Sequence, residues 1–124
     1  MNILFICREN LQRSPTAEDM LRDMAGDKVK VRSAGINRTA NRIVDRELLE
    51  WADIAYVMTE RIEERMRREF PGEMGDAKIR VLGIPDRYFR GEPRLKRRLL
   101  KEFSQDSYLA RYVKEEDFEK VEGE

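Results

Sequence analysis

The sequence contains no histidine and only one cysteine, Cys7, in 124 residues. The absence of histidine excludes His-based acid–base catalysis, Ser-His and Cys-His dyads, and most zinc sites. A single cysteine excludes an internal disulfide framework, so we expect a reducing, cytoplasmic setting. Any enzyme built from this chain must work with thiol, carboxylate, guanidinium and backbone groups.

Long apolar runs are also missing. No segment approaches the ~20 apolar residues of a membrane span, and residues 1–7 lack the basic leader and cleavage site of a signal peptide. We therefore expect no membrane association. The chain is 40% charged and 40% hydrophobic, a composition and length that fit one folded domain.

Positive and negative charges balance overall but are unevenly distributed. Residues 78–103 contain nine Lys/Arg and three Asp/Glu, whereas residues 104–124 contain three and seven. The basic stretch is compatible with a nucleic-acid surface, although such runs are more often the solvated face of a helix. We expect residues 1–103 to form the domain and residues 104–124 to form an acidic tail, either helical or disordered. The oligomeric state stays open.

Strand-like and helix-like segments alternate along the chain. The apolar pattern predicts strands over 2–6, 29–31, 54–58 and 79–82, and helices over 15–26, 45–51, 59–70 and 93–103. The strands lack polar alternation, which is typical of a parallel α/β sheet covered on both faces. Since sites in such sheets lie at the carboxyl ends of the strands, Cys7 and Asp86 are expected on one edge.

Cys7 and Arg13 belong to a short polar loop between the first strand and the first helix. N–H groups converging at a helix N-terminus stabilise a dianion, and the same field favours a thiolate nucleophile. Asn10 tolerates left-handed backbone, while Ser14 and Pro15 suit the N-cap and the first helical position. This context favours a phosphate site over a buried cysteine that only closes a core strand.

The segment Cys-x5-Arg-Ser-Pro-x-Ala-Glu, placed after an N-terminal apolar strand, resembles the low-molecular-weight protein tyrosine phosphatases. Ser33-Ala34-Gly35 matches the same family, and Ile84-Pro85-Asp86-Arg87-Tyr88-Phe89 is similar to its Asp-Pro-Tyr-Tyr loop. The resemblance covers about residues 1 to 103. It implies a four-stranded parallel sheet in the order 2-1-3-4, with helices on both faces and a phosphate-binding loop after strand 1.

The resemblance also implies a cysteine-dependent hydrolase that cleaves phosphate monoesters, either protein phosphotyrosine or aryl phosphate, and needs no cofactor or metal. Cys7 would attack phosphorus to form a phosphocysteine. Arg13 would bind two phosphate oxygens and stabilise the transition state, unless it is a surface salt-bridge residue. Asp86 would protonate the leaving oxygen and then activate water, unless it only forms a turn.

Two further groups of residues follow from the resemblance. The phosphate-binding residues would be Arg8, Glu9, Asn10, Leu11, Gln12, Arg13 and Ser14. Leu11, Tyr88 and Phe89 would form a wall for an aromatic ring, although a Tyr-Phe pair is otherwise most often core. Trp51 is a second wall candidate, for which core packing is favoured.

The sequence departs from the family pattern at three positions. Glu9 stands where the family has Gly, Gln12 where many members have a second cysteine, and Arg87 where Pro follows the acid. Glu9 either faces the pocket mouth, where it would favour phosphoarginine or basic peptides, or forms an exposed pair with Arg8.

Other functions stay open at this point. One alternative is a non-catalytic module of the same fold that binds phosphate or nucleic acid, although nucleic acid is the weaker expectation. Phosphoarginine phosphatase is another. Arsenate reductase is disfavoured because its chemistry needs further cysteines to resolve the intermediate.

Overall fold

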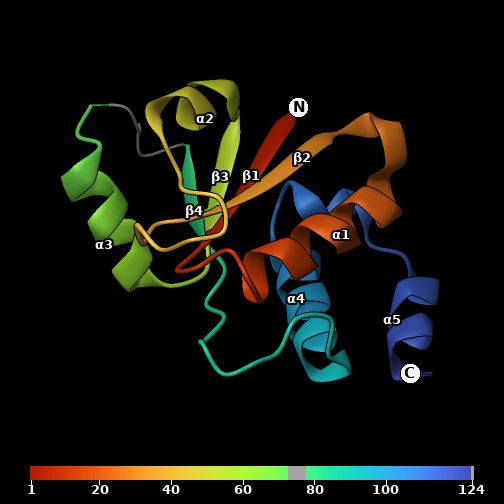
Figure 1. Cartoon of the computed structure of the whole chain (residues 1–124). Helices are drawn as coiled ribbons and strands as arrows, with labels where there is room; N and C mark the ends of the chain where they lie inside the picture. The colour runs from red at the N-terminus through yellow and green to blue at the C-terminus, as the bar shows by residue number, and fades with distance from the viewer. Residues whose placement is uncertain (73–77, 124) are drawn as a thin grey trace.

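The computed structural model describes residues 1–72 and 78–123. Four parallel strands form one sheet in the order β2-β1-β3-β4 (Figure 1), which confirms the predicted order. The strands are β1 (Asn2–Cys7), β2 (Lys30–Gly35), β3 (Ile54–Val57) and β4 (Ile79–Val81). The α-helices are α1 (Arg13–Ala25), α2 (Arg46–Trp51), α3 (Glu60–Glu69), α4 (Pro93–Gln105) and α5 (Glu115–Glu122). Helices α1, α4 and α5 lie on one side of the sheet and α2 and α3 on the other.

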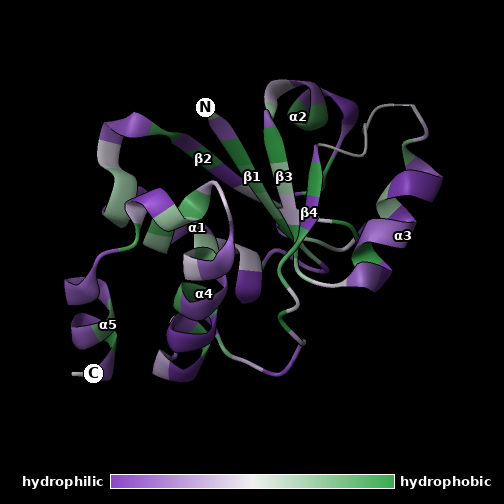
Figure 2. Ribbon diagram, turned by 180° about the vertical axis from the view of Figure 1, so that it is seen from behind, coloured by the Kyte–Doolittle hydropathy of each residue, from purple (hydrophilic) through white to green (hydrophobic). Residues whose placement is uncertain are grey.

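The core is centred on β1, which pairs with β2 on one edge and with β3 on the other. Its residues from Ile3 to Cys7 are all buried, as expected for an inner strand of a parallel sheet. The Phe5 ring stacks against Tyr56 of β3 and Phe103 of α4, with centroids 5.5 and 5.7 Å apart. Figure 2 shows the resulting hydrophobic centre between more polar helices.

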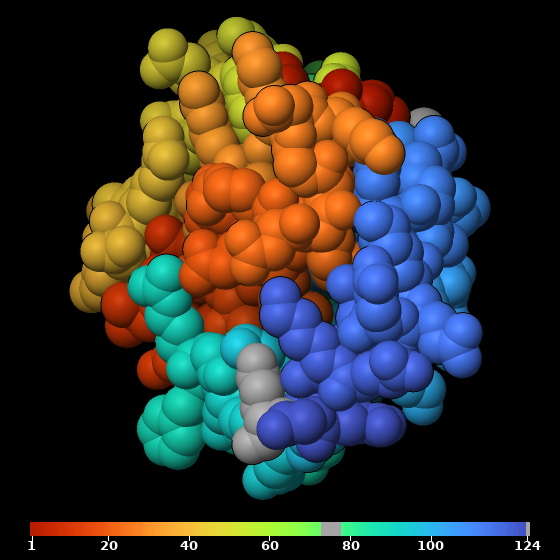
Figure 3. Space-filling model, turned by 90° about the vertical axis from the view of Figure 1, so that its right-hand side faces the viewer, coloured from red at the N-terminus to blue at the C-terminus, as the bar shows by residue number. Residues whose placement is uncertain are grey.

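The segment after residue 103 is packed against the domain. Tyr108 and Leu109 are buried members of the same core, and Tyr56 Oη donates a hydrogen bond of 2.7 Å to Asp106 Oδ2. Figure 3 shows the C-terminal segment lying against α1. Residues 106–109, which lie beyond the sequence-based boundary at residue 103, thus contact the core, and Glu115–Glu122 form a helix.

Several element ends differ from the sequence predictions. Strand β2 continues to Gly35 because residues 33–35 pair in register with Phe5, Ile6 and Cys7, a long-range pairing that local alternation does not reveal. Helix α1 begins at Arg13 and Ser14 is not its N-cap; the cap is Gln12, with no side-chain capping bond. The predicted helix over 59–70 is α3, and Thr59 is its N-cap, since the Thr59 hydroxyl accepts a hydrogen bond from Ile62 N.

Candidate active site

The loop between β1 and α1 is held from outside by the loop that follows β2. The carbonyl oxygens of Cys7, Arg8 and Glu9 accept hydrogen bonds of 2.9–3.0 Å from the N–H groups of residues 36, 37 and 41. Within residues 1–72 and 78–123, the N–H groups of residues 8, 9, 11 and 12 donate to no protein atom. The loop therefore has its acceptors engaged and its donors available, which is the arrangement of an anion-binding nest.

Gly35 makes this close approach possible. A Cβ atom at this position would lie 2.6 Å from Arg8 O and 2.8 Å from Asn10 N. Both neighbours are backbone atoms of the loop, so a larger residue would displace the loop itself. The Ser33-Ala34-Gly35 motif thus has a steric reason for ending in glycine at the end of β2.

The Cys7 thiol lies at the floor of this loop and is only 2% exposed. Its Sγ atom is 2.9 Å from Ser14 Oγ and accepts a hydrogen bond of 3.2 Å from Asn10 N. A backbone amide and a hydroxyl at the start of α1 thus converge on the sulfur. Both interactions favour negative charge on that atom, which a thiol needs in order to act as a nucleophile.

Asn10 fixes the shape of the loop, as the sequence predicted. It is the only non-glycine residue with a positive φ in the described part of the chain, at 54°. Its side-chain amide donates to Ser14 Oγ at 3.0 Å and to Ser33 Oγ at 2.8 Å. The Ser33 hydroxyl in turn donates to Glu18 at 2.5 Å. These supporting contacts of Ser33 and Glu18 were not foreseen, although both residues belong to the matched motifs.

Arg13 and Asp86 meet beside the loop. The Arg13 side chain is 2% exposed, and its Nη1 donates to Ile84 O at 2.8 Å. Its Nε lies 3.7 Å from Asp86 Oδ1, and Asp86 Oδ2 lies 3.5 Å from Arg8 Nη1. Burial lowers the pKa of Arg13, while the charges of Asp86 and Cys7 act against that shift. A buried guanidinium with one hydrogen bond among the described residues suits bidentate binding of an anion.

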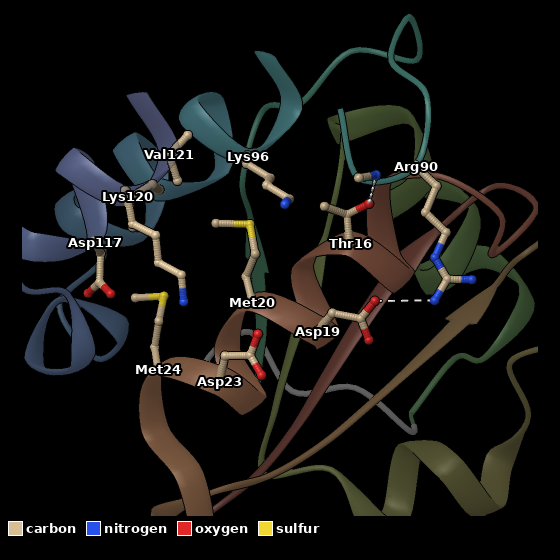
Figure 4. A pocket seen from close by; sticks show the side chains of 12 residues that line it. Thr16, Asp19, Met20, Asp23, Met24, Arg90, Lys96, Asp117, Lys120 and Val121 are labelled. Atoms are coloured by element: carbon tan, nitrogen blue, oxygen red, sulfur yellow. Dashed lines mark hydrogen bonds and ion pairs between the residues drawn. The ribbon is translucent and has the colours of Figure 1, made fainter. Parts of the chain in front are cut away.

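The loop that carries Asp86 is attached to the start of α1, and the attachment lies at the end of the loop that precedes α4. Arg90 N donates to Gln12 Oε1, and Gly91 N donates to Thr16 Oγ1 at 3.0 Å. Figure 4 shows the Thr16 contact and the ion pair between Arg90 and Asp19, at 3.2 Å. The sequence indicated Gln12 as a phosphate-binding residue and as a replacement for cysteine, but not its contact with Arg90. A cavity of about 260 Å³ lies between this attachment, α4 and α5.

Glu9 takes neither of the two orientations expected from the sequence. Its carboxylate accepts hydrogen bonds from Asn37 Nδ2 and Thr39 Oγ1. Among the described residues it makes no ion pair with Arg8, and it does not line the cavity beside Arg8 and Arg13. The bond from Asn37 is the main reason that the pKa of Glu9 lies below its usual value. Glu9 thus ties the phosphate loop to the loop after β2, because that loop presents donors directly beside it.

The predicted aromatic wall is only partly exposed. Leu11 is 52% and Phe89 74% exposed, whereas Tyr88 is buried and has the guanidinium of Arg94 5.6 Å from its ring centroid. Arg87 also faces this ring, at 5.9 Å. Trp51 lies at the end of β1 opposite Cys7, where its carbonyl oxygen accepts a hydrogen bond from Asn2 Nδ2. It packs against the core, which was the favoured alternative for this residue.

Ion pairs within the domain engage Arg80, Arg90 and Arg98 of the nine Lys/Arg residues in 78–103. Arg80 pairs with Asp106 at 3.0 Å and Arg98 with Glu102 at 3.1 Å, besides the pair of Arg90 with Asp19. Among the described residues, no group of His, Cys, Asp or Glu side chains could hold a metal ion. No helix in the described ranges is apolar and long enough to span a membrane.

The sequence matches the family model described as low molecular weight phosphotyrosine protein phosphatase over residues 2–107. No curated protein matches it at a significant level.

Similar folds occur among solved structures. A low molecular weight protein tyrosine phosphatase from Streptococcus pyogenes is 18% identical, with a TM-score of 0.73 and coverage of 95% of this chain and 97% of that one. One from Vibrio cholerae is 23% identical, with a TM-score of 0.66 and coverage of 82% and 89%. The YwlE arginine phosphatase from Geobacillus stearothermophilus is 20% identical, with a TM-score of 0.65 and coverage of 99% and 97%. At these identities the similarity concerns the fold.

Proposed function

Because the chain belongs to the low molecular weight phosphotyrosine protein phosphatase family, we propose that it hydrolyses protein phosphotyrosine, or an aryl phosphate, through a phosphocysteine on Cys7. Phosphatase activity follows from the family, whereas the substrate and the roles of the residues are the proposal. One observation carries it: Cys7 Sγ is held by Asn10 N and Ser14 Oγ on a loop with free N–H donors.

In the first step the Cys7 thiolate attacks phosphorus, forming an S–P bond while the bond from phosphorus to the leaving oxygen breaks. Arg13 and the loop amides bind the equatorial oxygens and stabilise the charge of the transition state. Asp86, near both Arg13 and Arg8, gives its proton to the leaving phenolate oxygen. The products of this step are the phenol and the phosphocysteine.

In the second step Asp86, now a carboxylate, takes a proton from a water molecule. The water oxygen bonds to phosphorus, the S–P bond breaks, and inorganic phosphate leaves. The electron pair of the broken bond returns to sulfur, where Asn10 N–H and the Ser14 hydroxyl stabilise the thiolate. Asp86 ends the cycle protonated, and no external oxidant or reductant is needed.

The test is turnover of p-nitrophenyl phosphate by the wild-type protein and by Cys7→Ser. We expect the wild type to release nitrophenolate and the variant to be inactive, since a serine hydroxyl does not form the nucleophilic anion that a cysteine thiol forms. Thermal unfolding and binding of inorganic phosphate should show that the variant is folded with its anion site intact. Activity of Cys7→Ser equal to that of the wild type would exclude the phosphocysteine intermediate. Absence of activity in both proteins would favour the alternative of a non-catalytic phosphate-binding module.

Phosphoarginine belongs in the same assay as a second substrate, because one of the similar folds is that of an arginine phosphatase. Arsenate reduction is not proposed, since Cys7 is the only thiol in the chain. A rate on phosphoarginine that exceeds the rate on phosphotyrosine would replace the proposed substrate but keep the proposed mechanism.

A further inference from the structure

A cavity of about 260 Å³ opens beside the phosphate loop, and its charge is mostly positive. It is lined by Arg8, Arg13, Thr59, Arg61, Ile62, Arg65 and Asp86. Two of the four arginines come from α3 and not from the phosphate loop. Figure 1 shows that α3 lies next to the loop that follows β2, and Arg65 Nη1 donates a hydrogen bond to Asn37 Oδ1 of that loop. The cavity thus joins the proposed reaction centre to α3.

The four arginines differ in how far they are already occupied. Arg13 is buried, and its Nη1 donates to Ile84 O at 2.8 Å. Arg65 is held by Asn37 at 2.6 Å and by Glu69 at 3.5 Å. Arg8 is exposed and lies 3.5 Å from Asp86. Arg61 is exposed and makes no ion pair or hydrogen bond within residues 1–72 and 78–123.

Nearby carboxylates weaken this positive charge but do not cancel it. Among the described residues, Asp86 is the only carboxylate that lines the cavity, and in the proposed first step it carries a proton. Glu60 and Glu64 line a neighbouring cavity that Arg61 also borders. Glu9 is hydrogen-bonded to Asn37, so it lies near Arg65. Arg61 and Arg8 are therefore the cations available to a second negative group of the substrate.

We propose that Arg61 and Arg8 select phosphotyrosine peptides with an acidic residue beside the phosphotyrosine. The phosphoryl group would occupy Arg13 and the loop amides, which leaves the exposed guanidinium groups for a flanking carboxylate. A basic neighbour would meet positive charge in the same place. This inference rests on the proposed function and concerns Arg61 of α3 and Arg8 of the loop after β1.

The experiment compares three phosphotyrosine peptides that differ only in having Asp, Ala or Lys beside the phosphotyrosine. Wild-type kcat/KM should fall in the order Asp, Ala, Lys, by roughly two- to fivefold for each exposed charge pair gained or lost. The ratio of Asp to Lys should shrink as salt rises, since exposed charges are screened within about 8 Å at physiological ionic strength.

Variants on α3 assign the preference to a side chain. Arg61→Gln should reduce the Asp-to-Ala ratio, and Arg61→Lys should keep most of it, because it retains the charge. Arg68→Gln is the matched control, since Arg68 is an exposed arginine of the same helix and does not line this cavity. It should leave the ratio unchanged.

Two failures can be told apart. Equal kcat/KM on the three peptides, or a preference that survives in Arg61→Gln, would overturn the inference while turnover of p-nitrophenyl phosphate still supports the proposed function. Absence of turnover on every substrate would overturn the proposed function and the inference with it.

Discussion

Asp86→Asn tests the proposed general acid, and the structure predicts two effects of opposite direction. The asparagine keeps the shape of the side chain but can neither give a proton to the leaving oxygen nor take one from water. We expect kcat on phenyl phosphate to fall by roughly 10²–10⁴, the usual scale for general acid–base catalysis. The loss on p-nitrophenyl phosphate should be smaller, because nitrophenolate leaves without a proton.

The second effect concerns binding. Asp86 lies 3.5 Å from Arg8 Nη1 and 3.7 Å from Arg13 Nε. In the form of the enzyme in which Asp86 is a carboxylate, its charge therefore competes with a bound anion for both guanidinium groups. Its side chain is 47% exposed, and ion pairs of this kind contribute about 0.2–1 kcal/mol. Removing the charge should therefore strengthen binding of inorganic phosphate by up to about fivefold.

The assay measures kcat on the two substrates and the inhibition constant of inorganic phosphate, for wild type and Asp86→Asn. The reasoning predicts a larger kcat loss on phenyl phosphate together with tighter phosphate inhibition. An equal loss on both substrates would refute the role as general acid, and weaker phosphate binding would indicate that Asp86 instead holds the two arginines in place.

Three more results are expected. Gly35→Ala should abolish turnover and lower thermal stability, because its Cβ would lie 2.6 Å from Arg8 O; a fully active variant would show that the loop tolerates displacement. Peroxide should oxidise Cys7 beyond the sulfenic acid to irreversible products, since no second thiol can cap it; complete recovery with dithiothreitol after long exposure would contradict this. Burial raises the pKa of Asp106, but hydrogen bonds from Leu109 N, Tyr56 and Arg80 outweigh burial and leave it below its usual value. Stability from this group is therefore present above the unfolded pKa of about 3.9 and lost as pH falls through the lower folded value. The free energy of unfolding of Asp106→Asn should depend less on pH below about 5 than that of wild type, and identical pH profiles in chemical denaturation would count against this reasoning.

Much of the fold was predictable because local patterns and long-range packing agree. The apolar runs of β1 and β3 are buried on both faces, so their composition alone indicated inner strands of a parallel sheet. The position of Cys7 and Asp86 on one sheet edge followed from the same rule. The end of β2 was missed because residues 33–35 are fixed by pairing with β1.

The part of the site that was not foreseen depends on side chains from distant segments. The two positions expected for Glu9, at the pocket mouth or paired with Arg8, followed from its neighbours on the same loop. Its observed partners, Asn37 and Thr39, are about 30 residues away in the sequence. The sequence did not single out Arg61, since nothing local places α3 beside the phosphate loop. The packing of Tyr108 and Leu109 was missed because a short, acidic segment gives a weak periodic signal.

The phosphocysteine can be sought directly by acid quench during turnover of p-nitrophenyl phosphate, followed by trypsin digestion and mass spectrometry. Cleavage after Arg8 yields the peptide of residues 1–8, in which Cys7 is the only nucleophilic side chain because it contains no Ser, Thr, Tyr, Asp, Glu, Lys or His. The account predicts a phosphoryl group on this peptide during turnover and none in Cys7→Ser. Steady turnover with this peptide unmodified at every quench time, or with the phosphoryl group on another peptide, would contradict it.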